Sequence, residues 1–164
     1  MANHLIVLVG PPGSGKTTWA RRHGSGAVHV SQDDLIDAIT PYGFEHRYRP
    51  VYAAAEEAVA RQALRSGHTV IVDRTNRTRA HRERWLRIAR ECGCPAVAVE
   101  MTTRPAVCRE RNRLRQDHRR LSEERMDRMF AAMEPVGDGE GFLAIYDGDS
   151  VDLAGIWKEE EKVA

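Results

Sequence analysis

The stretch from Leu5 to Ala20, LIVLVGPPGSGKTTWA, constrains the fold more than any other part of the sequence. Five apolar residues typical of a buried strand lead into a glycine-rich turn, and a helix-forming segment follows. Gly10, Gly15, Lys16 and Thr17 satisfy the pattern G-x-x-x-x-G-K-[ST] without deviation. A chance match on a glycine-rich turn is disfavoured, because the motif sits between a strand and a helix, the context that confirms it.

This motif predicts a phosphate-binding loop. Its glycines let the backbone curl so that successive N–H groups point at a phosphate chain, and the helix that follows adds the positive end of its dipole. We expect Lys16 to reach the β- and γ-phosphates and Thr17 to place its hydroxyl on Mg²⁺. ATP and Mg²⁺ are therefore the predicted cofactors, with nucleotide contacts from Gly13, Ser14, Gly15, Lys16, Thr17 and Thr18.

The remaining sequence alternates strand and helix patterns. Strands are predicted at 5–9, 27–30, 68–72, 95–101 and 142–146, and helices at 16–23, from 31 onward, at 51–66, 80–92, 105–114 and 122–133, and near the C-terminus. Strict alternation favours parallel β-α-β units. We predict an α/β fold with a parallel sheet of about five strands flanked by helices, forming one domain over residues 1–164.

The composition favours a protein of the reducing cytoplasm. No apolar run approaches the ~20 residues of a membrane span, and no signal peptide is visible. The three cysteines are an odd number and do not suggest a disulfide framework. A membrane partner is therefore not expected, and the oligomeric state stays open.

Arginine clusters suggest a polyanionic partner more than the net charge of +1 does. Arginine accounts for 22 of the 25 basic residues, since only three are lysine. Residues 74–90 hold seven arginines against one acidic residue, and residues 104–125 hold eight against four. A codon bias explains the ratio but not this clustering.

Two aspartates follow strands and are candidates for chemistry. Asp73 closes the third strand, where it can bind Mg²⁺ through water and orient Thr17, although it could also simply cap a helix. Asp33 follows the second strand, where a carboxylate could accept the proton of an acceptor hydroxyl. Asp34 and Asp37 compete with Asp33 for that role. Ligands bind beyond the carboxyl ends of parallel strands, so Lys16, Asp33 and Asp73 are expected at one rim.

The segment Val107–Arg115 places Arg111 and Arg115 four residues apart, on one face of a helix. Guanidinium groups on a helix-loop-helix can shield the charge of a migrating phosphoryl group, although an arginine face can also be merely solvated. We predict an arginine-rich helical lid at about 109–125, with both arginines contacting the nucleotide.

Residues 40–49 are predicted to form a loop over the site. Its aromatic residues Tyr42, Phe44 and Tyr48 could stack on a base or close a small hydrophobic lid.

With GPPGSGKTTWA, SQDD, VIVDRTN and CRERNRLR placed, the chain resembles the 5′-hydroxyl polynucleotide kinases, P-loop phosphotransferases of phages and bacterial repair systems. The likeness runs from Leu5 to about Tyr146. It implies a five-stranded P-loop kinase fold, with Lys16, Asp33 and Arg115 as catalytic residues and Asp33 as general base. It also implies that Thr17 and Asp73 hold Mg²⁺ and that Arg111 supports the nucleotide. Residues expected to contact the substrate are Asp33, Asp34, Arg74 and Asn76.

One position departs from that family. An arginine usually follows the catalytic aspartate by three positions and grips the phosphate 3′ of the acceptor nucleoside, but here that position is Ile36. Another arginine (Arg47, Arg49, Arg74 or Arg77) could replace it. The lead hypothesis is therefore an ATP-dependent kinase of the 5′-hydroxyl end of DNA or RNA. Alternatives are a kinase of a small hydroxyl compound or of a hydroxymethylated base in DNA, and a nucleotide-dependent switch.

Overall fold

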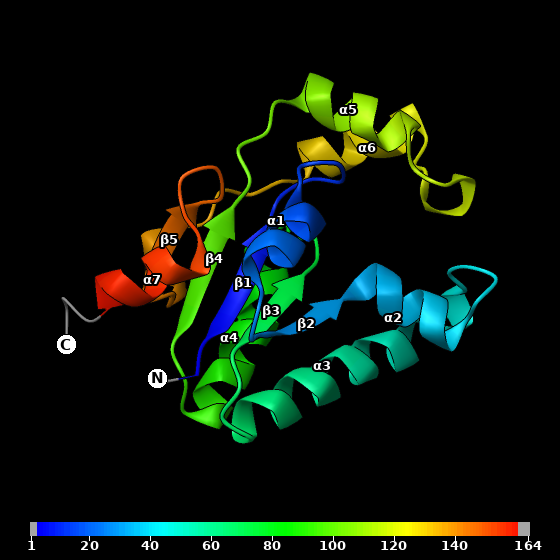
Figure 1. Cartoon of the computed structure of the whole chain (residues 1–164). Coiled ribbons are helices and arrows are strands. Elements are labelled where there is room, and N and C mark those ends of the chain that lie inside the picture. The colour runs from blue at the N-terminus through cyan, green and yellow to red at the C-terminus, as the bar shows by residue number, and fades with distance from the viewer. Residues whose placement is uncertain (1–2, 161–164) are drawn as a thin grey trace.

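The computed structural model describes residues 3–160, and at its centre lies a five-stranded parallel sheet (Figure 1). Its order is β2-β3-β1-β4-β5, and every neighbouring pair is parallel. The bounds are β1 Leu5–Val9, β2 Val28–Ser31, β3 Val70–Asp73, β4 Ala96–Glu100 and β5 Ala144–Asp147. The predicted α/β class and strand number are confirmed. Residues 1–2 and 161–164 of the predicted domain lie outside the described part.

Seven helices connect and follow these strands within the described residues. They are α1 Lys16–His23, α2 Gln32–Ile39, α3 Arg49–Arg65, α4 Arg79–Cys92, α5 Pro105–Arg113, α6 Glu123–Ala131 and α7 Leu153–Glu160. Short 3₁₀ turns occupy His46–Tyr48, Asp117–Arg119 and Asp138–Glu140. The expected loop at 40–49 thus contains a helical turn, and α3 starts earlier than predicted because Pro50 fits its first turn.

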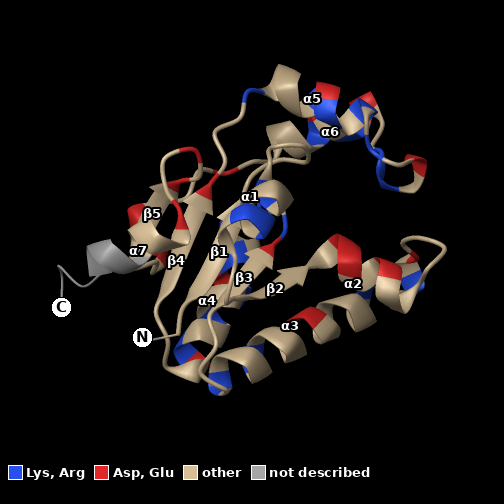
Figure 2. Cartoon of the chain, in the orientation of Figure 1, with Lys and Arg blue, Asp and Glu red and all other residues tan. Residues whose placement is uncertain are grey.

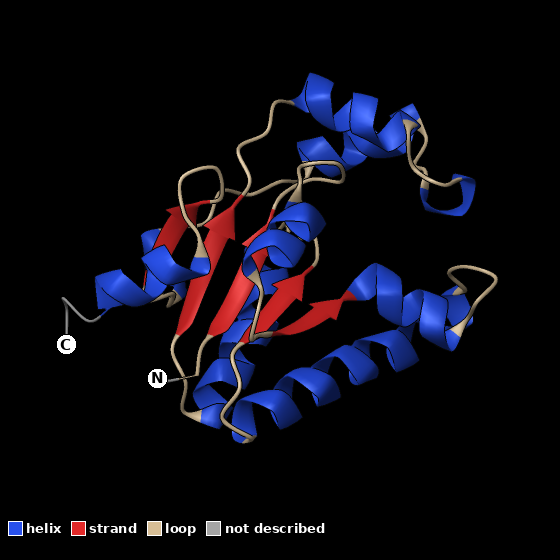
Figure 3. Cartoon of the chain, in the orientation of Figure 1, coloured by secondary structure: helices blue, strands red, loops and turns tan. Residues whose placement is uncertain are grey.

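The sheet is packed on both faces (Figure 3). In β1, Leu5, Val7 and Val9 join a core with Leu64 of α3 and with Trp85 and Leu86 of α4. The alternate residues Ile6 and Leu8 join a second core with Trp19 of α1 and with Leu153 and Ile156 of α7. Every residue of β1 is therefore buried, which explains why this strand reads as an unbroken apolar run.

Side-chain caps fix where three helices begin. The Ser31 hydroxyl accepts a hydrogen bond from the Asp34 amide at 3.3 Å, and the Ser122 hydroxyl accepts one from the Arg125 amide at 3.2 Å. Serine is among the residues preferred at this position of a helix. The hydroxyl of Thr78 caps α4 in the same way, a role not anticipated from the sequence. These caps align the first turns of α2 and α4 with the carboxyl ends of β2 and β3.

The helix-turn-helix of residues 105–131, called the α5–α6 segment below, stands beyond the carboxyl ends of the strands (Figure 1). Salt bridges join its two helices: Arg109 contacts Glu123 at 2.9 Å and Asp127 at 2.5 Å. The segment therefore overhangs the rim where Lys16, Asp33 and Asp73 were expected.

Among residues 3–160, no helix is both long enough and apolar enough to cross a bilayer. The three cysteines are free. Burial raises the pKa of the Cys94 thiol to about 11, so this side chain behaves as a small apolar group at neutral pH.

Candidate active site

A cleft of about 1480 Å³ lies at the carboxyl rim of the sheet. The P-loop, α2, α3, the turn after β3 and the α5–α6 segment all contribute to its walls. Of the residues predicted for the site, those that line the cleft are Gly13, Ser14, Gly15, Lys16, Thr17, Thr18, Asp33, Asp73, Arg74, Asn76, Arg111 and Arg115. Asp34 differs, because it is exposed, is not among the residues that line the cleft, and pairs with Arg119.

The P-loop backbone has the shape of an anion cradle. Gly13 adopts a φ of +79°, and a Cβ there would lie 2.4 Å from the carbonyl oxygen of Cys108. Gly15 has a φ of +99° and occupies the N-cap of α1. Because glycine has no side chain to cap the helix, the first-turn N–H groups remain directed at the cleft. The loop therefore fits a chain of phosphates.

Lys16 is folded back into the loop. Its Nζ donates hydrogen bonds to the carbonyl oxygens of Gly10 at 2.9 Å and Pro11 at 2.8 Å. Burial lowers the pKa of Lys16 to about 8, against the opposing charge of Asp73. A buried ammonium bonded only to neutral oxygens gains when an anion is placed beside it, so the loop is electrostatically prepared for phosphate.

Thr17 and Asp73 meet beside the P-loop. The Thr17 hydroxyl donates a hydrogen bond to Asp73 Oδ2 at 2.7 Å, and Nε2 of His29 lies 3.1 Å from the same oxygen. Burial alone would raise the pKa of Asp73, but these two hydrogen bonds and the charge of Lys16 outweigh it and lower the pKa. A hydroxyl and an ionised carboxylate are oxygen ligands that Mg²⁺ prefers, so these two residues could hold that ion directly or through water.

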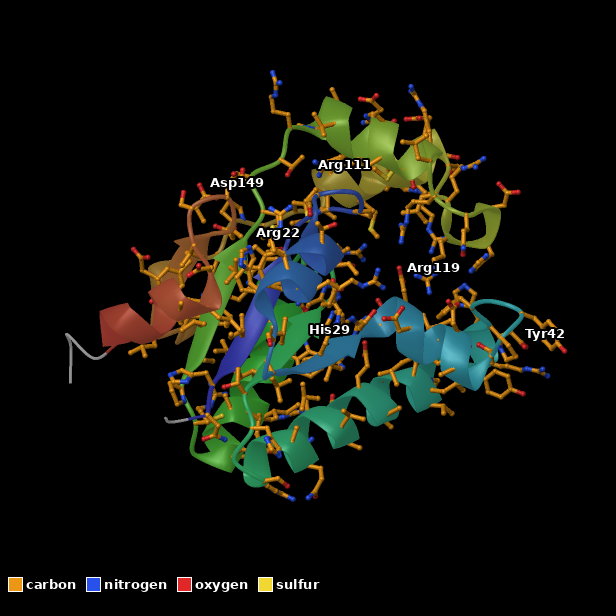
Figure 4. The ribbon with its side chains drawn as sticks, in the orientation of Figure 1. Arg22, His29, Tyr42, Arg111, Arg119 and Asp149 are labelled. Carbon is orange, nitrogen blue, oxygen red and sulfur yellow. The ribbon has the colours of Figure 1, made fainter. Side chains whose placement is uncertain are left out.

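Asp33 and Arg115 face each other across the cleft, although 82 residues separate them. Nη2 of Arg115 donates to Asp33 Oδ2 at 2.7 Å. Arg119 extends from the α5–α6 segment toward α2 and forms ion pairs with Asp37 and, at 3.4 Å, with Asp34 (Figure 4). Figure 2 shows the acidic residues of α2 opposite the basic residues of this segment. These pairs bridge the two walls of the cleft.

Arg111 contacts the P-loop directly, since its Nη1 donates to the carbonyl oxygen of Gly13 at 3.2 Å. Thr103 anchors the same loop from the β4–α5 connection, donating from its hydroxyl to the carbonyl oxygen of Ser14 at 2.8 Å. The α5–α6 segment therefore touches the P-loop at one end and α2 at the other.

Asn76 has a different place from the substrate contact expected of it. Its Nδ2 donates to the carbonyl oxygen of Leu8 at 2.7 Å, and its Oδ1 accepts from Nε1 of Trp85 at 3.0 Å. The residue is 2% exposed and has a φ of 43°. Both ends of the amide are already bonded within the protein, so we correct the assignment: Asn76 holds the turn after β3 against the end of β1.

Two residues that contact side chains of the cleft were not predicted from the sequence. His29 lies inside β2, and Glu56 lies on the buried face of α3 with Tyr52 and Ala60. His29 could have been noticed because it is a histidine within an otherwise apolar strand. The spacing of four residues between Tyr52, Glu56 and Ala60 could have placed the second on a buried face.

The aromatic residues of the loop after α2 do not act as a group. Tyr42 is 97% exposed and points away from the cleft (Figure 4). Phe44 lines the cleft and packs on Tyr52, with ring centroids 5.4 Å apart. Tyr48 contacts the guanidinium of Arg47 at 4.7 Å. Phe44 is therefore the aromatic residue of this loop that could contact a ligand in the cleft.

Comparisons with known proteins agree with this geometry. A family model described as "AAA domain" matches residues 5–136. A bifunctional polynucleotide phosphatase/kinase of Schizosaccharomyces pombe is 30% identical over 116 residues, which cover 70% of this chain and 25% of that protein. The chain thus spans about a quarter of the curated relative that it matches.

Solved structures with the same fold include a chain of an RNA repair complex and a gluconokinase. A chain in the structure of the Pnkp1/Rnl/Hen1 RNA repair complex superposes with a TM-score of 0.69 at 22% identity, covering 80% of this chain and 44% of that one. A gluconokinase from Sinorhizobium meliloti 1021 gives a TM-score of 0.61 at 19% identity, with coverages of 98% and 95%. At these identities the structures establish a shared P-loop kinase fold.

Proposed function

Because this chain belongs to the AAA domain family and is homologous to polynucleotide kinases, we propose that it is an ATP-dependent kinase of 5′-hydroxyl ends of DNA or RNA. The S. pombe relative supports a polynucleotide as acceptor, and so does the arginine-rich lining of the cleft. The same proposal assigns Lys16, Asp33 and Arg115 to catalysis.

One observation carries this proposal: the 2.7 Å contact between Asp33 and Arg115 at the mouth of a P-loop. A nucleotide-binding loop alone occurs in switches and in hydrolases. A carboxylate facing an arginine at the end of the loop supplies two further groups that phosphoryl transfer to an alcohol needs: a proton acceptor and a cation for the moving charge. This pair disfavours the reading as a nucleotide-dependent switch.

In the proposed reaction the P-loop N–H groups and Lys16 hold the phosphates of ATP, and Arg111 supports the nucleotide where it touches Gly13. Thr17 and Asp73 would hold Mg²⁺, which would supply positive charge to offset that of the phosphates. Asp33 accepts the proton of the acceptor hydroxyl as that oxygen forms a bond to the γ-phosphorus. The bond from that phosphorus to the bridging oxygen breaks, ADP leaves, and Arg115 lies against the transferred group.

The α5–α6 segment would act as a lid in this scheme. It carries Arg111 and Arg115, and it already reaches α2 through Arg119. Binding of ATP and acceptor must separate Arg115 from Asp33, because both groups then contact ligand. Before that, their contact at 2.7 Å keeps both side chains aimed at the reacting centre.

The test is transfer of labelled γ-phosphate from ATP with Mg²⁺ to 5′-hydroxyl oligonucleotides of DNA and RNA. We expect label on at least one of them. Asp33→Asn should lower kcat by roughly 10²- to 10⁴-fold and change the KM for ATP little, because the lost group is a base and not a nucleotide ligand. Asp127→Asn, a change of the same type on the exposed face of α6, should leave both constants unchanged.

Asp34→Asn separates the two competing carboxylates. A loss of turnover in this variant, with near-normal turnover in Asp33→Asn, would move the base to Asp34. Absence of label on any nucleic acid while ATP is consumed would contradict the polynucleotide assignment.

A kinase of a small hydroxyl compound or of a hydroxymethylated base is the second candidate, and Ile36 favours it. This side chain lines the cleft one helical turn after Asp33, so that wall presents an apolar group where an arginine was expected. Gluconate, free nucleosides and hydroxymethylated duplex DNA belong in the acceptor panel for this reason. Label on one of these alone would favour the second candidate.

A further inference from the structure

His29 is a polar residue in a part of the sheet where its neighbours are apolar. It lies between Val28 and Val30 in β2, an edge strand that pairs with β3 (Figure 4). In that pairing His29 is opposite Ile71, which packs in a core with Trp19 of α1. A half-buried imidazole there loses hydration and needs a hydrogen-bond partner.

That partner is Asp73. Ser31 is opposite Asp73 in the pairing of β2 with β3, and side chains two positions apart in a strand share a face, so His29 and Asp73 lie on the same face of the sheet. Nε2 of His29 is 3.1 Å from Asp73 Oδ2. The side chain of Asp73 is 4% exposed, against 23% for that of His29. The carboxylate is thus shielded from water, where a hydrogen bond is stronger than in solvent.

The direction of this hydrogen bond follows from the state of the carboxylate. Burial opposes ionisation of Asp73, but the hydrogen bonds from His29 and Thr17 and the charge of Lys16 lower its pKa. An ionised carboxylate can only accept hydrogen bonds. Nε2 of His29 therefore carries the hydrogen and is the donor.

The two oxygens of the Asp73 carboxylate have different surroundings. Oδ2 accepts hydrogen bonds from both His29 and Thr17. Oδ1 accepts none from residues 3–160, and Asp73 lines the cleft. His29 and Thr17 thus fix the carboxylate by one oxygen and leave the other for a cation or its water.

Thr17 depends on the same carboxylate for the orientation of its hydroxyl. A hydroxyl has one hydrogen and two lone pairs, and the hydrogen of Thr17 is directed at Asp73 Oδ2. The lone pairs remain for a ligand in the cleft, which Thr17 also lines. If the Asp73 carboxylate rotated, the hydroxyl would lose the acceptor that fixes its hydrogen. His29 therefore orients Thr17 through Asp73.

His29 acts from outside the cleft, because it is not among the residues that line it. Lys16 also attracts Asp73, but its Nζ donates hydrogen bonds to oxygens of the P-loop, and it is expected to turn to the phosphates when ATP binds. His29 is thus a contact of Asp73 that a bound nucleotide leaves in place.

We propose that His29 is a positioning residue for Mg²⁺: its Nε2–H group holds Asp73, and Asp73 orients Thr17, so that both residues present oxygen atoms to the ion. This inference rests on the proposed kinase function, since it takes the Mg²⁺ complex of ATP as the ligand. It assigns to His29 an effect on the affinity for Mg²⁺ that is separate from the affinity for nucleotide or acceptor.

The test measures the gain in nucleotide affinity that Mg²⁺ supplies, which requires no phosphoryl transfer. Isothermal titration calorimetry with a non-hydrolysable ATP analogue gives one Kd in EDTA and another in Mg²⁺, and their ratio is this gain. In His29→Leu we expect the ratio to fall roughly tenfold, as is typical for loss of a group that orients a metal ligand. The Kd in EDTA should not change, because His29 does not line the cleft.

Two further variants separate the hydrogen bond from packing. His29→Gln keeps an N–H donor at the end of the side chain, so its ratio should return to within about threefold of the wild-type value. His29→Val has no donor but suits a strand, so it should behave like His29→Leu and replaces that variant if it folds poorly. His68→Leu changes an exposed histidine outside the cleft and is the control, which should leave the ratio unaltered.

The transfer assay supplies a second measurement. In His29→Leu the Mg²⁺ concentration that gives half of the maximal rate should rise roughly tenfold, whereas the KM for the acceptor should stay the same.

Equal ratios in the wild type and His29→Leu would overturn the inference, as would a ratio in His29→Gln as low as that in His29→Leu. A wild-type ratio near one would overturn it as well. None of these outcomes depends on an acceptor. Absence of transfer to any acceptor, with the ratio lowered in His29→Leu as expected, would overturn the proposed function and leave the role of His29 standing.

Discussion

At the scale of single residues, Asn76 shows how one side chain secures the geometry of the site. It has a left-handed backbone, and its amide joins the end of β1 to Trp85 of α4. We expect Asn76→Gly to lower the free energy of unfolding by about 2 to 3 kcal/mol, because it leaves the indole N–H and the Leu8 carbonyl without partners. Asn76→Ala should cost about 1 kcal/mol more, since alanine resists a positive φ.

Urea unfolding followed by tryptophan fluorescence measures both values. Equal stabilities of the alanine and glycine variants would contradict the role given to the backbone. A loss below about 0.5 kcal/mol in both would contradict the role given to the amide. If Asn76 supports the site only through this turn, the glycine variant should show a larger change in kcat than in the KM for ATP.

The same residue marks a limit of sequence reasoning. Asn76 follows the end of a predicted strand, but the residues that bond to its amide lie 68 and 9 positions away. Local pattern fixes which residues lie at the rim of the sheet. It does not determine whether a polar side chain there faces the cleft or the protein, because that depends on long-range packing.

At the scale of elements, strands and helices with strong local signals were predicted well. Residues 5–9 and 16–23 have the predicted bounds, because an unbroken apolar run and a P-loop leave few alternatives. The 3₁₀ turns at 46–48 and 117–119 lie where no separate helix is predicted, since isolated 3₁₀ turns have no periodic pattern. The bridge from Arg119 to Asp34 and Asp37 joins residues more than 80 positions apart and has no local signal.

That bridge leads to a prediction for the α5–α6 segment. Asp37→Asn removes a carboxylate that both Arg119 and His118 approach. We expect the segment to separate from α2 more often in this variant. Trypsin should then cleave the arginine-rich stretch 115–120 roughly two- to fivefold faster, which is the effect expected from the loss of one partly exposed ion pair. An ATP analogue should protect the wild type, because Arg111 and Arg115 then contact the nucleotide.

Glu123→Gln is the control for this prediction, because it removes ion pairs within the α5–α6 segment and none to α2. Equal cleavage rates for the wild type and Asp37→Asn would show that the contact with α2 does not restrain the segment.

At the scale of the whole molecule, Arg82 connects the site to the C-terminal half of the chain. It is fully buried, and its guanidinium bonds both oxygens of Glu140 at 2.7 and 2.6 Å. It also donates to the backbone carbonyl oxygens of Asn76, Glu134 and Pro135. All five of its N–H groups thus have acceptors, so one arginine ties the turn after β3 to the segment that leads into β5.

This connection should make the stability of the fold depend on pH in a defined direction. Burial favours the protonated form of Glu140, but the hydrogen bonds from Arg82 prevail, and the pKa of Glu140 lies below its ordinary value of 4.5. A carboxyl whose pKa is lowered by folding stabilises the protein above the unfolded pKa and loses that contribution as the pH falls through the folded one.

Glu140→Gln should therefore lower the free energy of unfolding by about 3 to 5 kcal/mol at pH 7, since it leaves a buried guanidinium unpaired. The difference in free energy of unfolding between this variant and the wild type should become smaller as the pH falls below about 4. Urea unfolding at pH 7 and pH 3.5 measures it, with the surface variant Glu123→Gln as the control. A gap that stays constant between the two pH values would show that the ionised carboxylate is not what joins the two halves.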